Sequence, residues 1–579
     1  MKYAQLVALY TDIASTTKRL EKTAKIAAFL GETSEKDLAA VILLMQGRIF
    51  PIWDKRKLGV ADRLVIKALS ITTGVKAERI EDEWRRLGNL GDVAEKLIAK
   101  RKQVTLAKRD LMVSDIMRTL EKIAGLSGSG TVDHKTKLIC ELLSNADGEE
   151  ARYLVRTLLE DLRVGVATGV LRDAIVWAYL HPVAVVDGKP DITDREHYNL
   201  VIAAVDDAYH VYNDFSKVAA AAREGLRAIQ DVSLIVGHPV QAMLAQKETS
   251  IADAFARVGT PAALEYKYDG FRMQCHCTKG TITLFTRRLE DVTAQFPDVV
   301  EYLFKHVKAD SYIIDAEAVG YDAKTNKYRP FQDISQRIRR KYDISGTARS
   351  LPVELNVFDI LYLNGKSQLA VPLEKRRAAL AKIVKPLTGK VVLAKHIVTD
   401  SPKKAQAFFE ESVKQGNEGL MFKNLQGPYR PGSRVGTMVK LKSVMDTLDL
   451  VIVGAEWGEG KRSGWLTSFT LACADADDYL EIGKVGTGVK ELEQEGGVTF
   501  GELTDMLKPL IADQKGRDVT VRPKVVLEIK FEEIQKSPTY PSGYALRFPR
   551  VIQVRYDRAA EDVATLEEVE DAFFKQKKA

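Results

Sequence analysis

Cysteine is scarce in this chain. Only four cysteines occur among its 579 residues: Cys140, Cys275, Cys277 and Cys473. They are too few and too scattered for a disulfide framework, and Cys275 and Cys277 have no second pair at the spacing of a zinc ribbon. The sequence therefore predicts a reducing compartment and no structural zinc site.

Long apolar runs are also missing. No stretch approaches the roughly 18 apolar residues that are needed to span a bilayer. The N-terminus from Met1 to Leu20 is interrupted by Lys2, Asp12 and Lys18. The sequence therefore predicts a cytoplasmic protein with no membrane association.

Strong charge imbalance is absent as well. Lys and Arg number 86 against 79 Asp and Glu, a formal net charge of +7. This small excess permits a polyanionic partner without requiring one. With 28% charged and 45% hydrophobic residues the chain has the composition of a soluble globular protein, not of a disordered or collagen-like one. Because single cores rarely grow past about 250 to 300 residues, several domains are expected.

The pattern of apolar residues changes twice along the chain. Residues 1–235 have the spacing of helices, which predicts an all-α domain. Residues 236–446 interleave short alternating runs with helical stretches, which predicts an α+β domain built on antiparallel sheets. Residues 447–579 predict a small β-barrel of short strands, closed by a helix that begins at a capping box of Thr565 and Glu568.

Two groups of basic residues are candidates for contact with a polyanion. At helical spacing, Arg152, Arg156 and Arg163 fall within about 40° of one another, which would give a basic ridge. The second group consists of Arg337, Arg339, Arg340 and Lys341. Each group also fits an ordinary solvated helix face.

The segment from Glu265 to Arg272 reads as a strand that enters a turn at Gly270. A period of two places Glu265, Lys267 and Asp269 on one face. Charges that leave water cost several kcal/mol each unless they are paired, so this pattern indicates either a functional site or an exposed ladder of ion pairs.

Other strands of the same domain carry matching groups. Asp315 and Glu317 share a side of an apolar strand, Glu418 stands at a strand start, and Lys440 and Lys442 share a face. Carboxylates bind hard divalent cations, and lysines neutralise phosphate oxygens. This inventory of groups fits phosphoryl or nucleotidyl transfer.

The strings that contain these residues occur in the order of a known family. They are Lys267-Tyr268-Asp269-Gly270, Thr286-Arg287, Asp315-Ala316-Glu317, Phe358 to Gly365, Glu418 to Lys423 and Lys440-Leu441-Lys442. Over essentially its whole length the chain resembles the ATP-dependent DNA ligases of archaeal and eukaryotic type, within the covalent nucleotidyltransferase superfamily. Two strings near the C-terminus, Arg547 to Arg550 and Arg555 to Arg558, look like further motifs of that family.

The chain departs from the family pattern at two positions. Arg558 stands where the family usually has lysine, which changes the geometry of the positive charge from a point to a planar fork. Met438 stands where the family has an aromatic residue, commonly tryptophan, and still offers an apolar surface. We expect a tuned pocket and a retained activity.

The resemblance implies a fold, an activity and a set of partners. The fold is an all-α DNA-binding domain, an α+β adenylation domain and a C-terminal OB-fold barrel. The activity is the sealing of nicks in duplex DNA, in replication, repair and recombination. Lys267 would attack ATP to form lysyl-AMP, AMP would pass to the 5′-phosphate of the nick, and the 3′-hydroxyl would displace it. A monomer is expected, and the resemblance leaves open whether a sliding clamp recruits the protein.

The resemblance also implies roles for particular residues. Arginines and lysines of both basic groups would contact the DNA backbone. Mg²⁺ would be bound among Asp269, Glu317 and Glu418. ATP would be bound by Glu265, Arg272, Arg287, Glu317, Phe358, Arg434, Lys440 and Lys442.

Four other functions share part of this pattern. An RNA ligase or a capping guanylyltransferase has the lysine motif, but the large helical N-terminal region argues against both. An NAD-dependent ligase has a four-cysteine zinc element that these cysteines cannot form. A non-catalytic DNA-binding clamp would not need the lysine and the acids.

Overall fold

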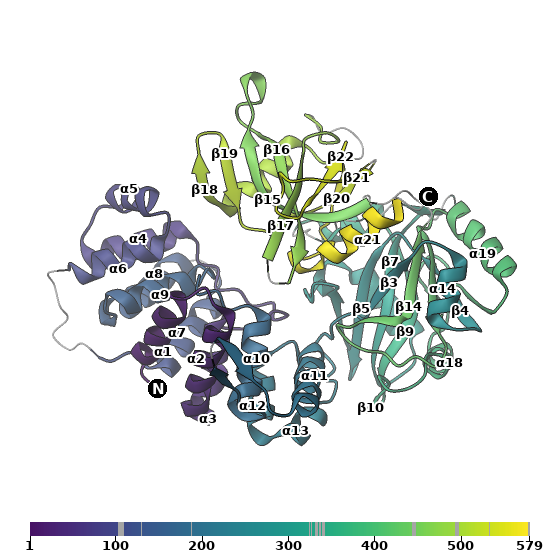
Figure 1. The fold of residues 1–579 in the computed structure, drawn as a ribbon, viewed down its shortest axis with the longest axis horizontal. Helices are drawn as coiled ribbons and strands as arrows, with labels where there is room; N and C mark the ends of the chain where they lie inside the picture. Colours follow the sequence, from purple (N-terminus) through teal and green to yellow (C-terminus); the bar gives the residue numbers. More distant parts are fainter. Residues whose placement is uncertain are drawn as a thin grey trace. The chain divides into compact units, whose positions relative to one another are not determined.

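The computed structural model describes residues 1–101, 109–128, 130–186, 188–322, 325, 327–329, 334, 337–338, 342–442, 447–476, 478–491, 497–531 and 533–576. The chain divides into two compact units, Met1–Ser233 and Leu234–Ala579. Helices make up most of the first unit, and strands dominate the second (Figure 1). The predicted sequence of a helical, a mixed and a strand-rich region is confirmed.

Among its described residues, the regular structure of the first unit is helical apart from one short hairpin of β1 (Ala184–Val186) and β2 (Lys189–Asp191). Helical spacing explains its core, since Leu6, Tyr10 and Ile13 of the first helix are fully buried. The helices are α1 (Tyr3–Ala14), α2 (Arg19–Glu32), α3 (Glu35–Met45), α4 (Asp62–Thr73), α5 (Ala77–Leu87), α6 (Leu90–Ala99), α7 (Val113–Gly125), α8 (Thr131–Asn145), α9 (Gly148–Leu158), α10 (Thr168–Tyr179), α11 (Arg195–Tyr212), α12 (Phe215–Glu224) and α13 (Leu226–Gln230).

The predicted basic ridge on α9 is wrong. The helix ends at Leu158, and Arg163 lies beyond it with a φ of 56°. Arg152 and Arg156 turn toward α6, where both bind the Asp92 carboxylate at 3.0 and 2.8 Å. Helical periodicity alone does not reveal this pairing, because Asp92 is distant in the sequence.

Two sheets form the central part of the second unit. One has the order β10-β9-β7-β5-β6, with β8 beside β7 and β11 beside β9, and the other has the order β12-β4-β13-β14-β3. Most pairs are antiparallel, as predicted, but β11 pairs with β9 and β3 with β14 in parallel. The strands are β3 (Leu244–Glu248), β4 (Ala262–Lys267), β5 (Phe271–Thr278), β6 (Thr281–Thr286), β7 (Ser311–Asp322), β8 (Lys327–Arg329), β9 (Val353–Leu363), β10 (Lys366–Ser367), β11 (Val391–Leu393), β12 (His396–Thr399), β13 (Gly419–Asn424) and β14 (Arg434–Lys442).

Helices cover both central sheets. The helices α14 (Ile251–Val258) and α19 (Pro402–Lys414) pack against the sheet that contains β13 and β14 (Figure 1). The helices α15 (Pro297–His306) and α18 (Leu373–Ile383) pack against the other sheet. A short helix, α17 (Ile344–Ser350), contacts α15. The two sheets contribute to separate apolar cores.

The C-terminal part is strand-rich, as predicted. Its larger sheet has the order β17-β16-β15-β19-β18, with β20 joining β15 to β23, and β21 pairs with β22. The predicted capping box is confirmed, because Glu568 N–H donates to Thr565 Oγ1 at 3.2 Å and Thr565 N–H to Glu568 Oε2 at 3.1 Å. The elements are β15 (Thr447–Trp457), β16 (Leu466–Asp475), β17 (Asp478–Val485), α20 (Phe500–Leu507), β18 (Ile511–Lys515), β19 (Asp518–Val521), β20 (Val526–Lys530), β21 (Glu533–Lys536), β22 (Tyr544–Arg547), β23 (Arg550–Val554) and α21 (Leu566–Gln576).

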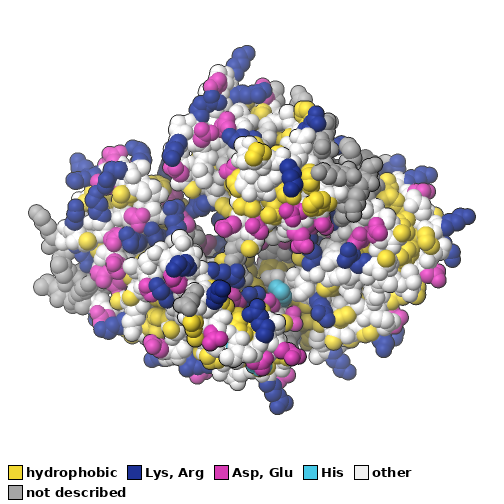
Figure 2. Space-filling model, viewed as in Figure 1, with side chains coloured by type: hydrophobic (Ala, Val, Ile, Leu, Met, Phe, Trp, Pro, Cys, Tyr) yellow, Lys and Arg dark blue, Asp and Glu magenta, His cyan; other side chains and the backbone are white. Residues whose placement is uncertain are grey.

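The mixed charge of the surface and the unpaired cysteines agree with the nearly balanced charge and the low cysteine content of the sequence. Lys and Arg side chains are interspersed with Asp and Glu over the face shown in Figure 2. All four cysteines are free. Within the described ranges, no helix combines the length and apolarity that crossing a membrane requires.

The predicted contact of the second basic group with DNA is wrong for Arg337. This side chain is 1% exposed, and its guanidinium binds the Asp298 carboxylate at 2.6 and 3.0 Å. It also donates to the carbonyl oxygens of Leu351 and Gln295. Arg337 is therefore a structural residue, and the predictions for Arg339, Arg340 and Lys341 lie outside the described residues.

Replacing Arg337 with methionine is expected to lower the free energy of unfolding by about 3 kcal/mol, because the partly buried Asp298 loses its counter-charge. Urea unfolding measures this loss. Replacing the exposed Arg349 with alanine is the matched control and should change stability by less than about 0.5 kcal/mol. Unchanged stability together with weaker DNA binding in the Arg337 variant would restore the DNA-contact prediction.

Candidate active site

A pocket of about 180 Å³ collects the residues that the sequence predicts for the site. Strands of both central sheets line it, together with Arg555, Asp557 and Arg558 from the C-terminal part. Asp269 is the one predicted residue that does not line it. The predicted residues that do are Glu265, Lys267, Arg272, Arg287, Glu317, Phe358, Glu418, Arg434, Lys440 and Lys442.

Lys267 is the last residue of β4, and its Nζ lies 2.6 Å from Glu418 Oε2. Lys442 Nζ lies 3.0 Å from the same oxygen. Strand register explains this convergence, because β13 lies between β4 and β14 and its first residue, Gly419, is opposite both Lys267 and Lys442. Burial alone would raise the pKa of the Glu418 carboxyl, but the two lysines hold it well below its ordinary value.

Two glycines allow this close approach of strands. Gly419 has a φ of 144°, and a Cβ there would lie 2.1 Å from the carbonyl oxygen of Leu441. A Cβ on Gly270 would lie 2.5 Å from the carbonyl oxygen of Ala318 and 3.0 Å from Glu317 Cγ. Larger residues would push these strands apart and widen the site.

Positive charge accumulates at one side of the pocket. Burial, together with the charges of Arg558, Lys442 and Lys267, lowers the pKa of Lys440 well below its ordinary value. Burial and Arg558 also lower the pKa of Arg287 to about 10. Such mutual repulsion makes the pocket a favourable place for a polyanion such as a triphosphate.

Glu317 lies on β7, opposite Arg272 of β5. Desolvation raises the pKa of its carboxyl to about 8, so an added cation would stabilise the charged form. Glu317 and Glu418 therefore fit a divalent cation that takes its remaining ligands from a substrate.

The predicted metal trio is not assembled. Across the described residues there is no group of three or more His, Cys, Asp or Glu side chains placed to hold a metal ion. Asp269 is the residue that departs from the prediction. Strand β4 ends at Lys267, so the alternation that would put Asp269 beside Glu265 and Lys267 stops before it.

Glu265 lies at the other side of the pocket beside an aromatic ring. Its buried carboxylate binds Lys423 Nζ at 2.6 Å and Arg377 Nη1 at 3.1 Å. The Phe358 ring makes cation–π contacts with two side chains. Lys423 Nζ lies 4.7 Å and Arg272 Cζ 5.3 Å from its centroid. This side of the pocket combines an aromatic ring, on which a base can stack, with a fixed carboxylate that can accept hydrogen bonds.

Arg377 is a site residue that sequence reasoning missed. It lies on α18, where the run from Leu373 to Lys382 looks like an ordinary solvated helix. Besides binding Glu265 it donates to the carbonyl oxygen of Phe358 at 3.2 Å. It thus holds the carboxylate and the aromatic residue together, and no motif marks it.

Replacing Arg377 with methionine is expected to raise KM for ATP about ten-fold, because a hydrogen bond to a charged group contributes about 1.5 to 3 kcal/mol. The rate of protein adenylation as a function of ATP concentration measures KM. Replacing the exposed neighbour Lys375 with alanine provides a control on the same helix. Equal KM values for both variants and the parent protein would contradict a role for Arg377.

The C-terminal part reaches the pocket through ion pairs. Asp562 binds Arg287 at 3.0 Å, and Glu568 of α21 pairs with Arg434. The Nε of Arg558 lies 3.0 Å from Asp449 Oδ2. Met438 is 6% exposed and lines the pocket as an apolar residue.

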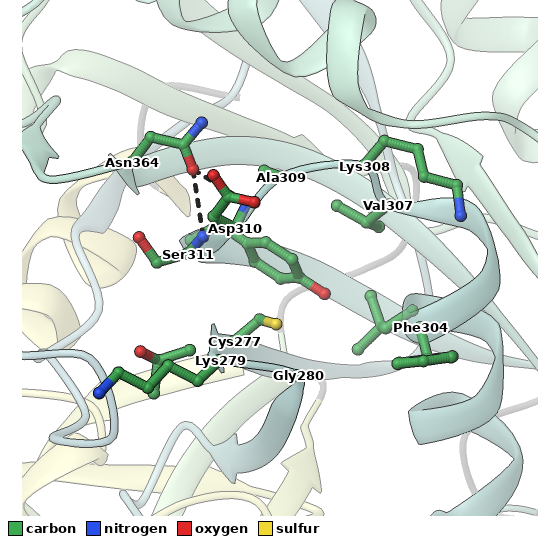
Figure 3. A pocket seen from close by; sticks show the side chains of 13 residues that line it. Cys277, Lys279, Gly280, Phe304, Val307, Lys308, Ala309, Asp310, Ser311 and Asn364 are labelled. Atoms are coloured by element: carbon green, nitrogen blue, oxygen red, sulfur yellow. Dashed lines mark hydrogen bonds between the residues drawn. The ribbon is translucent and has the colours of Figure 1, made fainter.

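A larger pocket, of about 880 Å³, lies at the end of the hairpin of β5 and β6. Phe304, Val307 and Lys308 face it from one side (Figure 3). Asn364 Oδ1 accepts from the backbone N–H groups of Asp310 and Ser311. The predicted site residues, all of them described, do not line this pocket.

Comparisons with known proteins identify the family of the chain. Residues 2–176 match the family model of the DNA ligase N terminus, residues 242–442 that of the ATP dependent DNA ligase domain, and residues 462–558 that of the ATP dependent DNA ligase C terminal region. A DNA ligase of Nanoarchaeum equitans is 45% identical over 581 residues, covering 100% of this chain and 99% of the relative. A DNA ligase of Archaeoglobus fulgidus is 41% identical and covers 98% of each chain. A structure of a mycobacterial DNA ligase D complexed with ATP and MES is 26% identical, with a TM-score of 0.36, over 56% of this chain and 98% of that one. From these models and full-length relatives it follows that the chain belongs to the ATP-dependent DNA ligase family.

Proposed function

We propose that the protein seals nicks in duplex DNA, and that the pocket around Lys267 is where ATP is consumed. One observation carries this proposal: Lys267 ends a strand inside a pocket that has a cationic side and a side with an aromatic ring and a carboxylate. The first side suits a triphosphate and the second suits adenine. The amine between them is then placed for attack on the α-phosphorus.

In the first step Lys267 Nζ forms a bond to the α-phosphorus, and the bond from that phosphorus to the pyrophosphate oxygen breaks. The amine must lose its proton before it can attack. Glu418, at 2.6 Å, stabilises the protonated amine in the free protein. We infer that Glu418 turns to another cation when ATP is bound, and that Lys440 and Lys442 then favour the uncharged amine.

In the second step AMP passes to the 5′-phosphate of a nick, and in the third the 3′-hydroxyl displaces AMP. Each transfer puts charge on phosphate oxygens, so the residues act by position and charge. Lys440, Lys442 and Arg287 are proposed to neutralise these oxygens, and Arg272 to bind beside the ribose.

Mg²⁺ is proposed to bind at Glu317 and Glu418. Two carboxylates that line the same pocket, one with its pKa raised to about 8 by burial, suit an ion that usually binds through one or two carboxylates and substrate phosphates. When bound, such an ion would neutralise the charge that develops on the phosphate oxygens.

For adenine we propose the Phe358 ring and Glu265. Stacking on an aromatic face contributes about 1 to 3 kcal/mol and does not distinguish bases. Discrimination of the base is assigned to the Glu265 carboxylate, which Arg377 and Lys423 hold in place.

Domain limits of 1–235, 236–446 and 447–579 are proposed for the DNA-binding, adenylation and OB-fold domains, with duplex DNA as the partner of all three. The cytoplasm is the proposed compartment, because four free cysteines suit a reducing environment. Monomeric action stays a prediction.

The test is to incubate the protein with α-labelled ATP, dATP or GTP and then to add a nicked duplex. We expect label from ATP on the protein, followed by its loss as the nick is sealed. Labelling by GTP in preference to ATP would favour a capping-type enzyme. A nicked duplex that is bound and never sealed would favour a non-catalytic clamp.

A further inference from the structure

The segment 237–243, with which the chain enters the second unit, lies along one face of β5. Arg272, Gln274 and His276 alternate on that face, as the period of two requires. Each of the three side chains bonds to the main chain of the segment. The Gly237 N–H donates to His276 Nδ1 at 3.0 Å, the Val240 N–H to Gln274 Oε1 at 2.7 Å, and Arg272 Nη1 to the Met243 oxygen at 3.0 Å.

The same side chains bond to one another in a fixed direction. Because His276 Nδ1 accepts, the ring proton is on Nε2, which lies 2.9 Å from Gln274 Oε1 and donates to it. Burial lowers the pKa of His276 to about 3, so the ring is neutral at physiological pH. The Gln274 amide in turn donates to Asp315 Oδ1 at 3.2 Å.

Asp315 completes the path to the pocket. It is fully buried, and its Oδ2 accepts from Arg272 Nη2 at 2.5 Å and from the Tyr429 hydroxyl at 2.8 Å. The Tyr429 hydroxyl accepts from the Met243 N–H at 3.2 Å, which returns the chain of bonds to the segment. Since buried charges without partners are costly, this arrangement holds Arg272 in one orientation.

Arg272, Met243 and Tyr429 line the nucleotide pocket, whereas Gln274 and His276, both described, do not. We propose that Gln274 and His276 are positioning residues that fix the segment 237–243 and, through Asp315, aim Arg272 at the nucleotide. They would therefore set the affinity for ATP without touching it. This inference rests on the proposed function of the pocket.

The test compares the full-length protein with two variants on neighbouring residues of β5. Gln274→Leu removes the amide and keeps the approximate size of the side chain. KM for ATP in protein adenylation is expected to rise about ten-fold, with the rate at saturating ATP within about three-fold of the parent value. Cys275→Ala is the matched control, because Cys275 is fully buried on the opposite face and its loss disturbs packing alone.

A second variant, His276→Phe, tests the same path if the first does not fold. It is also expected to raise KM for ATP. The rise in KM of the double variant should be close to that of each single variant and smaller than their combined effect, because residues of one network do not act additively. A KM within two-fold of the parent value in either folded variant, with a thermal midpoint lowered as in Cys275→Ala, would overturn the inference. A parent protein that forms no adduct would instead defeat the proposed function, so the two failures are distinguishable.

Discussion

Replacing Lys267 with arginine is expected to end covalent labelling of the protein by α-labelled ATP. Arginine keeps the positive charge beside Glu418, but a guanidinium does not lose its proton in proteins and cannot act as a nucleophile. The rate of adduct formation should fall by at least about 10³-fold. Autoradiography of the denatured protein measures it.

The same variant provides its own control. A nick that already carries AMP on its 5′-phosphate needs no lysyl-AMP, so the Lys267→Arg protein should still seal it. An unchanged thermal midpoint would show that the variant is folded. Label that persists on the variant would mean that another residue is the nucleophile.

Replacing Lys440 with alanine is expected to lower the rate of adenylation at saturating ATP by about 10²- to 10³-fold, the effect of removing one group that stabilises developing charge. Lys440 lies within the cationic side of the pocket, where burial and neighbouring cations lower its pKa. Binding of a triphosphate would restore its charge at the reacting phosphate. Single-turnover adduct formation measures the rate.

Lys395 gives a matched control for this variant. It is an exposed lysine of the same domain that pairs with Glu411 at 2.5 Å and does not line the pocket. Lys395→Ala should keep the parent rate. If Lys440→Ala lost less than five-fold, its ammonium would not act on the reacting phosphate.

Strand periodicity predicted part of the pocket correctly because it is a local property, whereas Arg287, Phe358 and Arg434 were predicted from the family resemblance. Glu265 and Lys267 share a face, and so do Lys440 and Lys442, since each pair lies two residues apart on one strand. Asp269 shows the limit of this reasoning. The alternation holds only while the strand lasts, and β4 ends at Lys267.

Pairing over long sequence distances could not be predicted in this way. Arg337 looked like a solvated basic residue, yet it is buried against Asp298. Arg156 is likewise held by Asp92 of another helix. In each case the tertiary contact decides whether an arginine contacts solvent or supports the fold, and no local pattern encodes that contact.

Arg377 shows the same limit at the site itself. Its helix has no motif, and its role depends on Glu265, which lies 112 residues earlier in the chain. The path through His276, Gln274 and Asp315 is also invisible in the sequence, because it depends on where the segment 237–243 lies against β5.

The central claim is that Lys267 becomes covalently bonded to AMP. Its most direct test is to incubate the protein with ATP and Mg²⁺, digest it, and locate the added mass of AMP by tandem mass spectrometry. The account predicts AMP on the peptide that contains Lys267, on that lysine alone. AMP on a different residue, or sealed nicks without any protein adduct, would contradict it.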